Sequence, residues 1–308
     1  HAQTIWAALY SRRGTSTPLG FERERWTTPD HDFIDVDFLR ARPDSRWLVA
    51  FHGLEGSSKS QYIQAFASVA QRAGLNFAAP HFRGCSGALN LAPRAYHSGD
   101  FEEIGWILAR LRERAAAPLL AAGVSLGGNA LLRWAQESGS SAAQTAAAVA
   151  AICSPIDLAA GGHAIGRGFS RLSYTPMFLR SMKPRALAKL AQHPGLFDRE
   201  RLLAARDLYE FDNVFTAPLH GFKNTEDYWA RCSAKPLLHT IRIPALVLNA
   251  RNDPFVPASC LPARQEVGDH VTLWQPAHGG HVGFPAGAPP GHVLTMPQAV
   301  LGWLHAHT

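Results

Sequence analysis

The sequence has little cysteine, and its cysteines do not form the patterns that a zinc ribbon or a disulfide framework requires. Its 308 residues include four cysteines, Cys85, Cys153, Cys232 and Cys260, which lie far apart and form no C-x-x-C pair. This spacing excludes a zinc ribbon and the dense cross-linking of a small secreted domain. Unpaired cysteines in a chain of this size predict a reducing compartment, so we expect a cytoplasmic protein without a structural metal.

Long apolar runs and blocks of like charge are also absent. No run reaches the length of a transmembrane helix, and residues 1–14 lack the basic stretch followed by an apolar segment that marks a secretory signal. Charged residues make up 18% of the chain, and the formal net charge is +6. Because the arginines are scattered rather than grouped, we expect a solvated basic surface and no nucleic-acid partner.

Short apolar runs alternate with patterns of helical period along most of the chain. We expect strands at residues 32–41, 46–53, 75–84, 118–124, 146–155, 243–253 and 270–276, and helices at 62–74, 101–115, 126–139 and 296–307. The run at 32–41 alternates with period two, which is typical of a half-exposed strand. The order predicts an α/β fold with a mostly parallel, doubly wound sheet of about eight strands, whose functional residues lie at the carboxyl ends of the strands.

Residues 156–235 interrupt this alternation. They form short helical patterns rich in Leu, Phe, Arg and Pro, without a clear strand. We expect a helical lid inserted into a core made of residues 1–155 and 236–308. Within the lid, residues 168–192 mix Phe, Leu and Met with Arg and Lys, and we interpret them as an amphipathic part of the lid packed on the core. The alternative interpretation is contact with an acyl chain and an anionic membrane surface.

The stretch AAGVSLGGNA at residues 121–130 contains the pattern G-x-S-x-G around Ser125. The pattern alone is weak, but here an expected strand precedes it and an expected helix follows it, which is the context of a nucleophilic serine on a sharp turn. Such a turn leaves no room for side chains two residues before and after the serine, where the chain has Gly123 and Gly127. The amide of Leu126, at the helix N-terminus, would be one oxyanion donor.

An acid and a histidine must follow the serine along the chain in this kind of sheet. Asp253 comes just past the expected strand at 243–253, and we prefer it to Asp157, which more naturally caps a helix. After the last expected strand, the stretch AHGGHVGF offers two histidines, His278 and His281. Position alone leaves both histidines open as the base.

The loop FHGLEGSSKS at residues 51–60 follows another expected strand and offers the second oxyanion donor. A His-Gly pair, His52 and Gly53, lets the backbone come close to the substrate, so that the next amide, that of Leu54, can face the oxyanion. The same loop could be read as a phosphate loop, but it lacks the pattern G-x-x-x-x-G-K-[ST]. We therefore do not expect nucleotide binding.

Several stretches together resemble the α/β-hydrolase superfamily and, within it, the YheT-like esterases related to the mammalian ABHD1 and ABHD3 proteins. They are HGLEGSSKSQY (52–62), HFRGCSGALN (81–90), YHSGD (96–100), FDNVFTAPLHGFKNTEDYW (211–229), GVSLGGNALLRW (123–134), DPFVP (253–257) and HGGHVGF (278–284). The resemblance covers most of the chain from about residue 50 onward. It implies the α/β-hydrolase fold, with Ser125 as nucleophile, Asp253 as acid and His281 rather than His278 as base.

The resemblance also places Arg83, Tyr96 and His97 near one another beside the site. We expect these three residues, with His52 and Gly53, to support the surrounding loops rather than to contact substrate directly. One departure from the family pattern is Glu103, which stands where an aspartate usually follows the YHSG segment. We expect Glu103 to make a structural contact, with Arg83 as the candidate partner.

Together these features predict a serine hydrolase that cleaves carboxylic esters with short or medium acyl groups and needs no metal or organic cofactor. The substrate would be a small-molecule or lipid ester. A lipase, phospholipase or acyltransferase with the same triad is the first alternative, because the fold does not choose among them. A non-catalytic scaffold for ligand or protein binding is the second.

Overall fold

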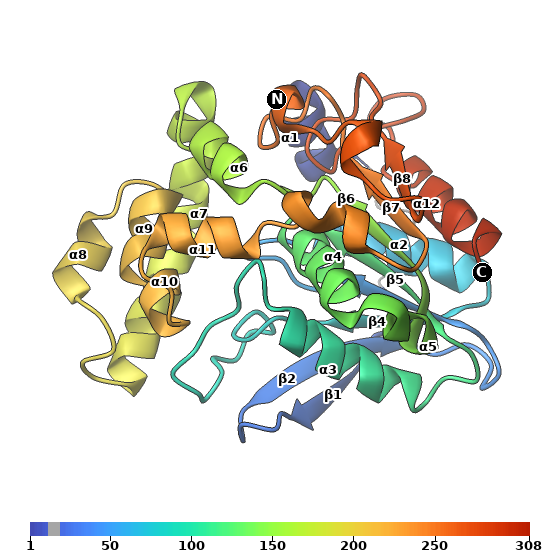
Figure 1. Ribbon diagram of the computed structural model, residues 1–308, viewed down its shortest axis with the longest axis horizontal. Coiled ribbons are helices and arrows are strands. Elements are labelled where there is room, and N and C mark those ends of the chain that lie inside the picture. The colour runs from blue at the N-terminus through green and yellow to red at the C-terminus, as the bar shows by residue number, and fades with distance from the viewer. Residues whose placement is uncertain (12–18) are drawn as a thin grey trace.

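The computed structural model describes residues 1–11 and 19–308, and its centre is an eight-stranded sheet (Figure 1). The strand order is β1-β2-β4-β3-β5-β6-β7-β8, with β1, β2 and β4 paired antiparallel and the pairs from β4 to β8 parallel. The strands are β1 (Glu22–Thr27), β2 (Phe33–Leu39), β3 (Trp47–Phe51), β4 (Asn76–Pro80), β5 (Leu119–Val124), β6 (Ala146–Ile152), β7 (Ala245–Leu248) and β8 (Val271–Trp274). The prediction of a mostly parallel sheet is confirmed.

Helices cover both faces of the sheet, as expected for a doubly wound fold. On one face lie α2 (Gln61–Arg72) and α12 (Thr295–Ala306), and on the other α3 (Phe101–Arg112) and α4 (Leu126–Ser138). Alternation along the strands supplies both cores, since Leu48 and Ala50 of β3 pack toward α2 and α12 while Val49 and Phe51 pack toward α3 and α4. The shorter elements are α1 (Ala2–Leu9), η1 (Gly139–Ser141), α5 (Ala142–Thr145), η2 (Lys235–Thr240), η3 (Ala258–Cys260) and η4 (Arg264–Glu266).

Between β6 and β7 the chain leaves the sheet and builds a group of helices, seen at the left of Figure 1. They are α6 (Leu158–Ile165), α7 (Gly168–Gln192), α8 (Arg199–Ala204), α9 (Leu208–Val214), α10 (Thr216–Leu219) and α11 (Thr225–Cys232). The expectation of short helical pieces is wrong for α7, which is 25 residues long and contains Pro176 and Pro184. The group has an apolar cluster of its own, in which Leu179 and Met182 of α7 meet Phe211 and Phe215.

Strand β2 differs from the sequence-based expectation. Alternation at 32–41 predicted a half-exposed strand, but all seven residues of β2 are buried. The polar positions are covered because β1 lies alongside with arginines in register: Arg23 is directly opposite Asp37, and Arg25 is directly opposite Asp35. The guanidinium of Arg23 binds Asp37 at 2.7 Å and that of Arg25 binds Asp35 at 2.8 Å. Cross-strand ion pairs therefore replace solvent on this face of β2.

Asn129, in the first turn of α4, connects the core to the helical group. Its side chain is fully buried and donates to the carbonyl oxygens of Ser98 and Cys232, each at 2.8 Å. Its amide oxygen accepts from the backbone N–H of Ala234 at 3.0 Å. One side chain thus satisfies backbone groups from the loop before α3 and from the segment that leads back into the core.

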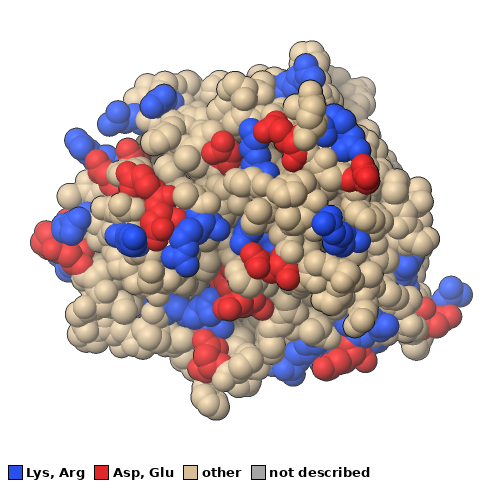
Figure 2. All heavy atoms as spheres, in the orientation of Figure 1, with Lys and Arg blue, Asp and Glu red and all other residues tan. Residues whose placement is uncertain are grey.

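Charge is mixed over the surface. Figure 2 shows Lys and Arg interspersed with Asp and Glu on the face in view, without a broad area of one sign. Within residues 1–11 and 19–308, no helix combines the length and the apolar character that crossing a membrane requires.

Candidate active site

Ser125 occupies a sharp turn between the end of β5 and the start of α4. Its backbone has φ of 53° and ψ of −121°, a conformation that costs energy for a residue with a side chain. A Cβ on Gly123 would lie 2.4 Å from the carbonyl oxygen of Gly127, and a Cβ on Gly127 would lie 2.4 Å from that of His52. Both glycines are therefore required by close backbone packing, as the G-x-S-x-G pattern predicted.

His281 and Asp253 lie beside Ser125, each in the loop that follows a neighbouring strand. His281 Nε2 is 3.1 Å from Ser125 Oγ, and His281 Nδ1 is 2.9 Å from Asp253 Oδ2. The other carboxylate oxygen of Asp253 accepts the backbone N–H of Phe255 at 2.8 Å. A hydroxyl, an imidazole and a buried carboxylate are thus connected in the order that nucleophilic catalysis by serine requires.

The structure separates these residues from the alternatives that the sequence offered. His278 is exposed, whereas His281 points to the serine. Asp157 caps α6, as expected, by accepting the backbone N–H of Ala160 at 3.0 Å.

The loop that carries His281 is held by α1, which sequence reasoning missed. The backbone N–H of His281 donates to Thr4 Oγ1 at 2.9 Å. The amide oxygen of Gln3 accepts from the backbone of Gly279 at 3.0 Å and from Asn252 at 2.7 Å. The first turn of α1 therefore supports the loops of both the histidine and the aspartate. No pattern within residues 1–10 signals this role, because it depends on residues more than 240 positions away.

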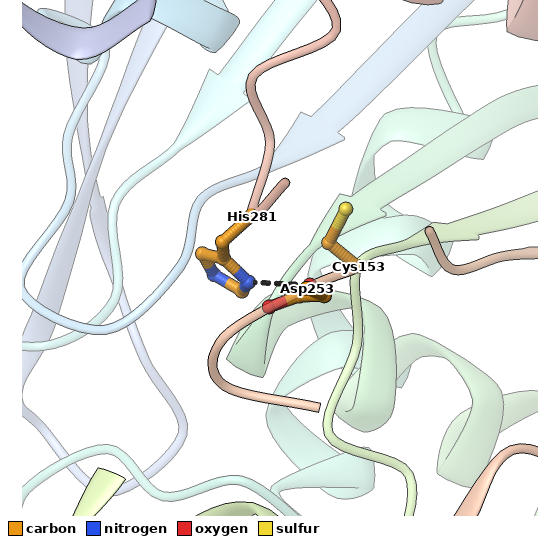
Figure 3. A group of neighbouring side chains, drawn as sticks. All are labelled: Cys153, Asp253 and His281. Carbon is orange, nitrogen blue, oxygen red and sulfur yellow. Dashed lines mark hydrogen bonds and ion pairs between the residues drawn. The ribbon is translucent and has the colours of Figure 1, made fainter. Parts of the chain in front are cut away.

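Cys153 lies beside the histidine and the aspartate (Figure 3). Its Sγ accepts the backbone N–H of Val282 at 3.3 Å. Within the described part of the chain, Cys153, Asp253 and His281 are the one group of three potential metal ligands whose ligating atoms cluster. Burial, with the nearby Asp253 carboxylate, raises the pKa of the Cys153 thiol well above its ordinary value, which opposes the deprotonation that metal binding needs.

Leu54 and Leu126 both line the pocket that contains Ser125. Leu126 is the first residue of α4, and the first amides of a helix have no acceptor within the helix. Leu54 is the second residue of a turn closed by a hydrogen bond from the Gly56 N–H to the Gly53 carbonyl at 3.0 Å. Both residues therefore border the space beside Ser125, and the role of their amides as oxyanion donors stays a prediction.

His52 and Gly53 shape the Leu54 loop from below. The imidazole of His52 is 1% exposed, with Nδ1 2.8 Å from the Gly53 carbonyl and Nε2 accepting the backbone N–H of Phe82 at 3.1 Å. The backbone N–H of Gly53 donates to Tyr62 Oη at 3.0 Å. Both nitrogens of His52 are matched only when the ring is neutral, and burial lowers its pKa to about 3.

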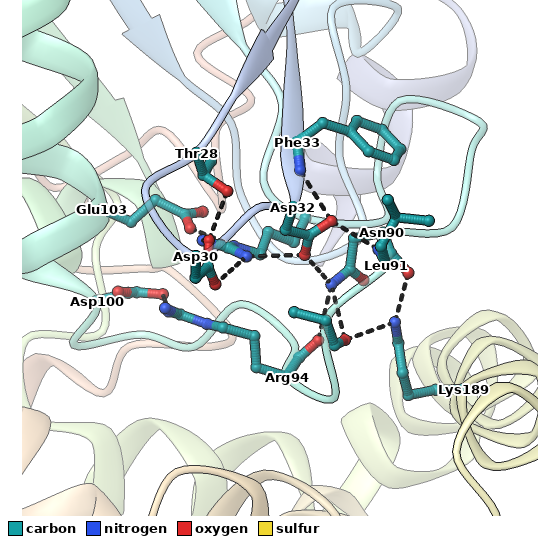
Figure 4. Close-up of polar contacts among 12 residues, drawn as sticks. Thr28, Asp30, Asp32, Phe33, Asn90, Leu91, Arg94, Asp100, Glu103 and Lys189 are labelled. Carbon is teal, nitrogen blue, oxygen red and sulfur yellow. Dashed lines mark hydrogen bonds and ion pairs between the residues drawn. The ribbon is translucent and has the colours of Figure 1, made fainter.

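Arg83 is surrounded by carboxylates. It binds Asp30 at 2.8 Å and Asp32 at 2.7 Å, and it also binds Glu103, the contact expected from the sequence. Figure 4 shows these carboxylates converging from the loop before β2 and from α3. Burial, with the nearby Asp100, raises the pKa of Glu103 to about 7. Because several carboxylates engage the Arg83 guanidinium, the geometry favours loop support over substrate contact.

Tyr96 and His97 line the same pocket, each with partners of its own. Tyr96 Oη donates to Glu55 at 2.8 Å, whereas the His97 ring contacts that of His220 in a tilted arrangement, with centroids 4.4 Å apart. Burial lowers the pKa of His97, so this ring is neutral near pH 7. Arg83, Tyr96 and His97 are thus neighbours around one pocket rather than one hydrogen-bonded group.

The pocket above Ser125 contains about 1100 Å³ of empty space, a volume that includes open solvent. The helical group supplies much of its wall, chiefly apolar side chains: Leu158, Ile165, Phe178, Met182, Phe211, Phe215 and Trp229. Ser125 and His281 lie on the core side of this space. An apolar substrate group can therefore extend from the serine between the core and the helices.

Comparison with known proteins gives one family and a consistent fold. Residues 46–288 match the model of a family described as alpha/beta hydrolase fold. The chain is 36% identical to YheT of Escherichia coli (strain K12) over 311 aligned residues, covering 99% of this chain and 89% of YheT. It is 29% identical to mouse "Phospholipase ABHD3", covering 94% of this chain and 72% of that protein.

Solved structures share the fold at low sequence identity. A bacterial membrane phospholipase A superposes with a TM-score of 0.58 at 16% identity, covering 99% of this chain and 90% of that one. The Pyrococcus furiosus esterase Pf2001 superposes with a TM-score of 0.54 at 16% identity, covering 96% and 95%.

The neutral state of His52 predicts a loss of stability in acid. The folded pKa is about 3 and the unfolded pKa about 6.5, so below pH 6.5 the unfolded chain takes up a proton that the folded chain does not. The contribution of neutral His52 to the free energy of unfolding is therefore fully present above pH 6.5. It is lost as the pH falls toward 3, at about 1.4 kcal/mol per pH unit.

Urea unfolding at pH values between 7 and 5 measures this effect in the wild type and in His52→Gln. The variant should show a smaller fall in the free energy of unfolding, by about 2 kcal/mol over this range. His278→Gln, which changes an exposed histidine, controls for the substitution. Equal pH dependence in wild type and His52→Gln would contradict a neutral, buried His52.

Proposed function

The chain belongs to the α/β-hydrolase fold family, and on this premise we propose that it is a serine hydrolase that cleaves carboxylic esters through an acyl-enzyme intermediate. The observation that carries the proposal is the hydrogen-bonded series Ser125–His281–Asp253 at the base of an apolar pocket. The names of relatives point in the same direction, since they include phospholipase ABHD3 and a yeast monoacylglycerol lipase.

In the first step, His281 Nε2 accepts the proton of Ser125 as Oγ attacks the ester carbonyl carbon. Asp253 keeps the imidazole in the tautomer with a proton on Nδ1 and stabilises the imidazolium that forms. The negative charge on the carbonyl oxygen is held by the Leu54 and Leu126 amides, each worth roughly 3 kcal/mol. The imidazolium then protonates the leaving alkoxide, which leaves the acyl group on Ser125.

In the second step, His281 takes a proton from water as the water oxygen attacks the acyl carbon. Collapse of the tetrahedral intermediate returns the proton to Ser125 and releases the acid. These steps need no metal or organic cofactor. An alcohol in place of water would give acyl transfer by the same route, so the residues around Ser125 support both outcomes.

We further propose that residues 156–235 act as a lid over a core made of residues 1–155 and 236–308. The support is that α6, α7, α9 and α11 contribute apolar side chains to the pocket wall above Ser125. Such walls suit the apolar acyl group of an ester, for which we propose a short or medium length. The four cysteines are all free and buried, which supports a reducing compartment such as the cytoplasm.

A lipid ester is the second candidate substrate, and the outer face of α7 is the observation that favours it. Phe169, Leu172 and Met177 are 53%, 80% and 55% exposed, and Arg171 and Arg180 are exposed among them. The sequence of α7 contains no acidic residue. Apolar side chains flanked by cations suit an anionic lipid surface, while the inner face of the same helix lines the pocket.

The ester hydrolase proposal is tested with p-nitrophenyl esters of graded acyl length. Ser125→Ala and His281→Ala should each lose about 10⁴-fold or more in kcat, because nucleophile and base act as one unit. Ser141→Ala and His278→Ala, which change exposed residues of the same types, should retain activity. Absence of hydrolysis for every ester in the wild type would contradict the proposal and favour a non-catalytic scaffold.

The lipid-surface proposal is tested by co-sedimentation with vesicles of phosphatidylcholine, with and without phosphatidylglycerol. Leu172→Asp should lower the fraction bound to anionic vesicles by about tenfold, because it removes an apolar side chain and adds a charge repelled by the surface. Leu237→Asp, at an exposed leucine of the core, should bind like the wild type. Absence of wild-type binding, or equal binding to both vesicle types, would contradict the proposal.

A further inference from the structure

The Leu54 amide belongs to a turn that depends on an unusual backbone conformation. In the turn Gly53–Leu54–Glu55–Gly56, the residue after Leu54 has φ of 58°, in the left-handed region that favours glycine. Here that residue is Glu55, which has a side chain. A glutamate keeps this conformation only where its surroundings hold it, and a change in the Glu55 backbone would disturb the turn that contains the Leu54 N–H.

The surroundings hold Glu55 through its carboxylate and its backbone. Tyr96 Oη donates to Glu55 Oε1 at 2.8 Å and accepts the Glu55 backbone N–H at 2.9 Å. Arg185 Nη1 lies 3.0 Å from the same carboxylate oxygen, Oε1. The side chain of Glu55 is 10% exposed, so these contacts operate in a largely desolvated environment, where they are stronger than on the surface.

Arg185 comes from the helical lid, not from the core. It lies on α7, on the same inner face as Phe178 and Met182, which line the pocket. Its Nη1 also donates to Cys85 Sγ at 3.0 Å, and burial raises the pKa of that thiol to about 12, so the thiol is neutral. The guanidinium therefore joins α7 to two loops of the core, one of which carries Leu54.

We propose that Arg185 is a positioning residue that holds the Leu54 amide toward Ser125 by fixing Glu55. The oxyanion hole is then complete only when α7 is packed on the core, so that closure of the lid and readiness for catalysis are coupled. This role rests on the proposed function, because it requires Leu54 to be an oxyanion donor.

The pairing of Arg185 with Glu55 distinguishes this role from direct binding of an anionic substrate. A guanidinium already opposite a carboxylate offers little net charge to a ligand. A substrate contact would act on KM, whereas misplacement of an oxyanion donor acts on the transition state and therefore on kcat. The two roles therefore give opposite kinetic patterns.

The experiment compares steady-state hydrolysis of p-nitrophenyl butyrate in the wild type and in Arg185→Ala, Arg185→Lys and Glu55→Gln. Arg185→Ala should lower kcat by about 10- to 100-fold, less than full loss of a donor, with KM within about twofold. Arg185→Lys should recover at least about threefold of this loss, because an ammonium can still pair with Glu55. Glu55→Gln, which keeps an acceptor for Tyr96 but removes the charge opposite Arg185, should also lower kcat.

The affinity for a boronic acid inhibitor is a measurement that would not change if Arg185 had only a structural role. It forms a tetrahedral adduct with a catalytic serine, so its affinity should fall in proportion to kcat across the variants. Arg199→Ala, which breaks an arginine–glutamate pair on the surface of the same lid, should match the wild type. Thermal unfolding checks that each variant is folded. If Arg185→Ala does not fold, Glu55→Gln still tests the proposal.

Two results in an active wild type would overturn the positioning role. One is a raised KM with unchanged kcat in Arg185→Ala, which would make Arg185 a substrate contact. The other is unchanged kinetics and unchanged boronic acid affinity in both Arg185→Ala and Glu55→Gln. A wild type that neither hydrolyses esters nor binds the boronic acid would instead refute the proposed function, and the positioning role with it.

Discussion

The absence of space around the turn at Ser125 is the constraint on which the site depends. Backbone atoms of β3, β5 and α4 approach so closely there that a single Cβ at Gly123 or Gly127 would overlap a carbonyl group. This packing forces Ser125 into a left-handed conformation and leaves its hydroxyl at the carboxyl edge of the sheet. The same turn begins α4 directly after Ser125, so the proposed nucleophile and one proposed oxyanion donor, the Leu126 amide, are adjacent in the chain.

The other groups reach this point from segments far apart in the chain. Parallel strands end at one edge, which brings the loops after β7 and β8, with Asp253 and His281, next to Ser125. Helix α7 is tied to the same edge at two places. Arg185 pairs with Glu55, and the buried ammonium of Lys189 donates to the carbonyls of Asn90 at 2.6 Å and Ala92 at 2.9 Å. The sheet domain and the helices of residues 158–232 thus build the pocket together.

Local patterns in the sequence predicted the features that depend on local physics. Alternation and helical period located the parallel strands and their helices, and glycine spacing located the turn at Ser125. Features that depend on distant partners could not be predicted. The arginines of β1 have a structural role only because they lie opposite Asp35 and Asp37. Gln3 and Thr4 likewise have theirs only because they hydrogen-bond to the loop of His281. The pairing of Arg185 with Glu55 joins positions 130 residues apart, and no short-range pattern in the sequence predicts it.

The central claim is that His281 and Asp253 make Ser125 nucleophilic, and covalent labelling tests it most directly. The wild type is treated with a fluorophosphonate, which phosphonylates activated serines, and the labelled peptide is identified by mass spectrometry. The account predicts one adduct, on Ser125, whose formation is slowed at least about 100-fold in Asp253→Asn, because the imidazole loses its orienting partner. No adduct on the folded wild type, or an adduct on another residue with Ser125 unmodified, would contradict it.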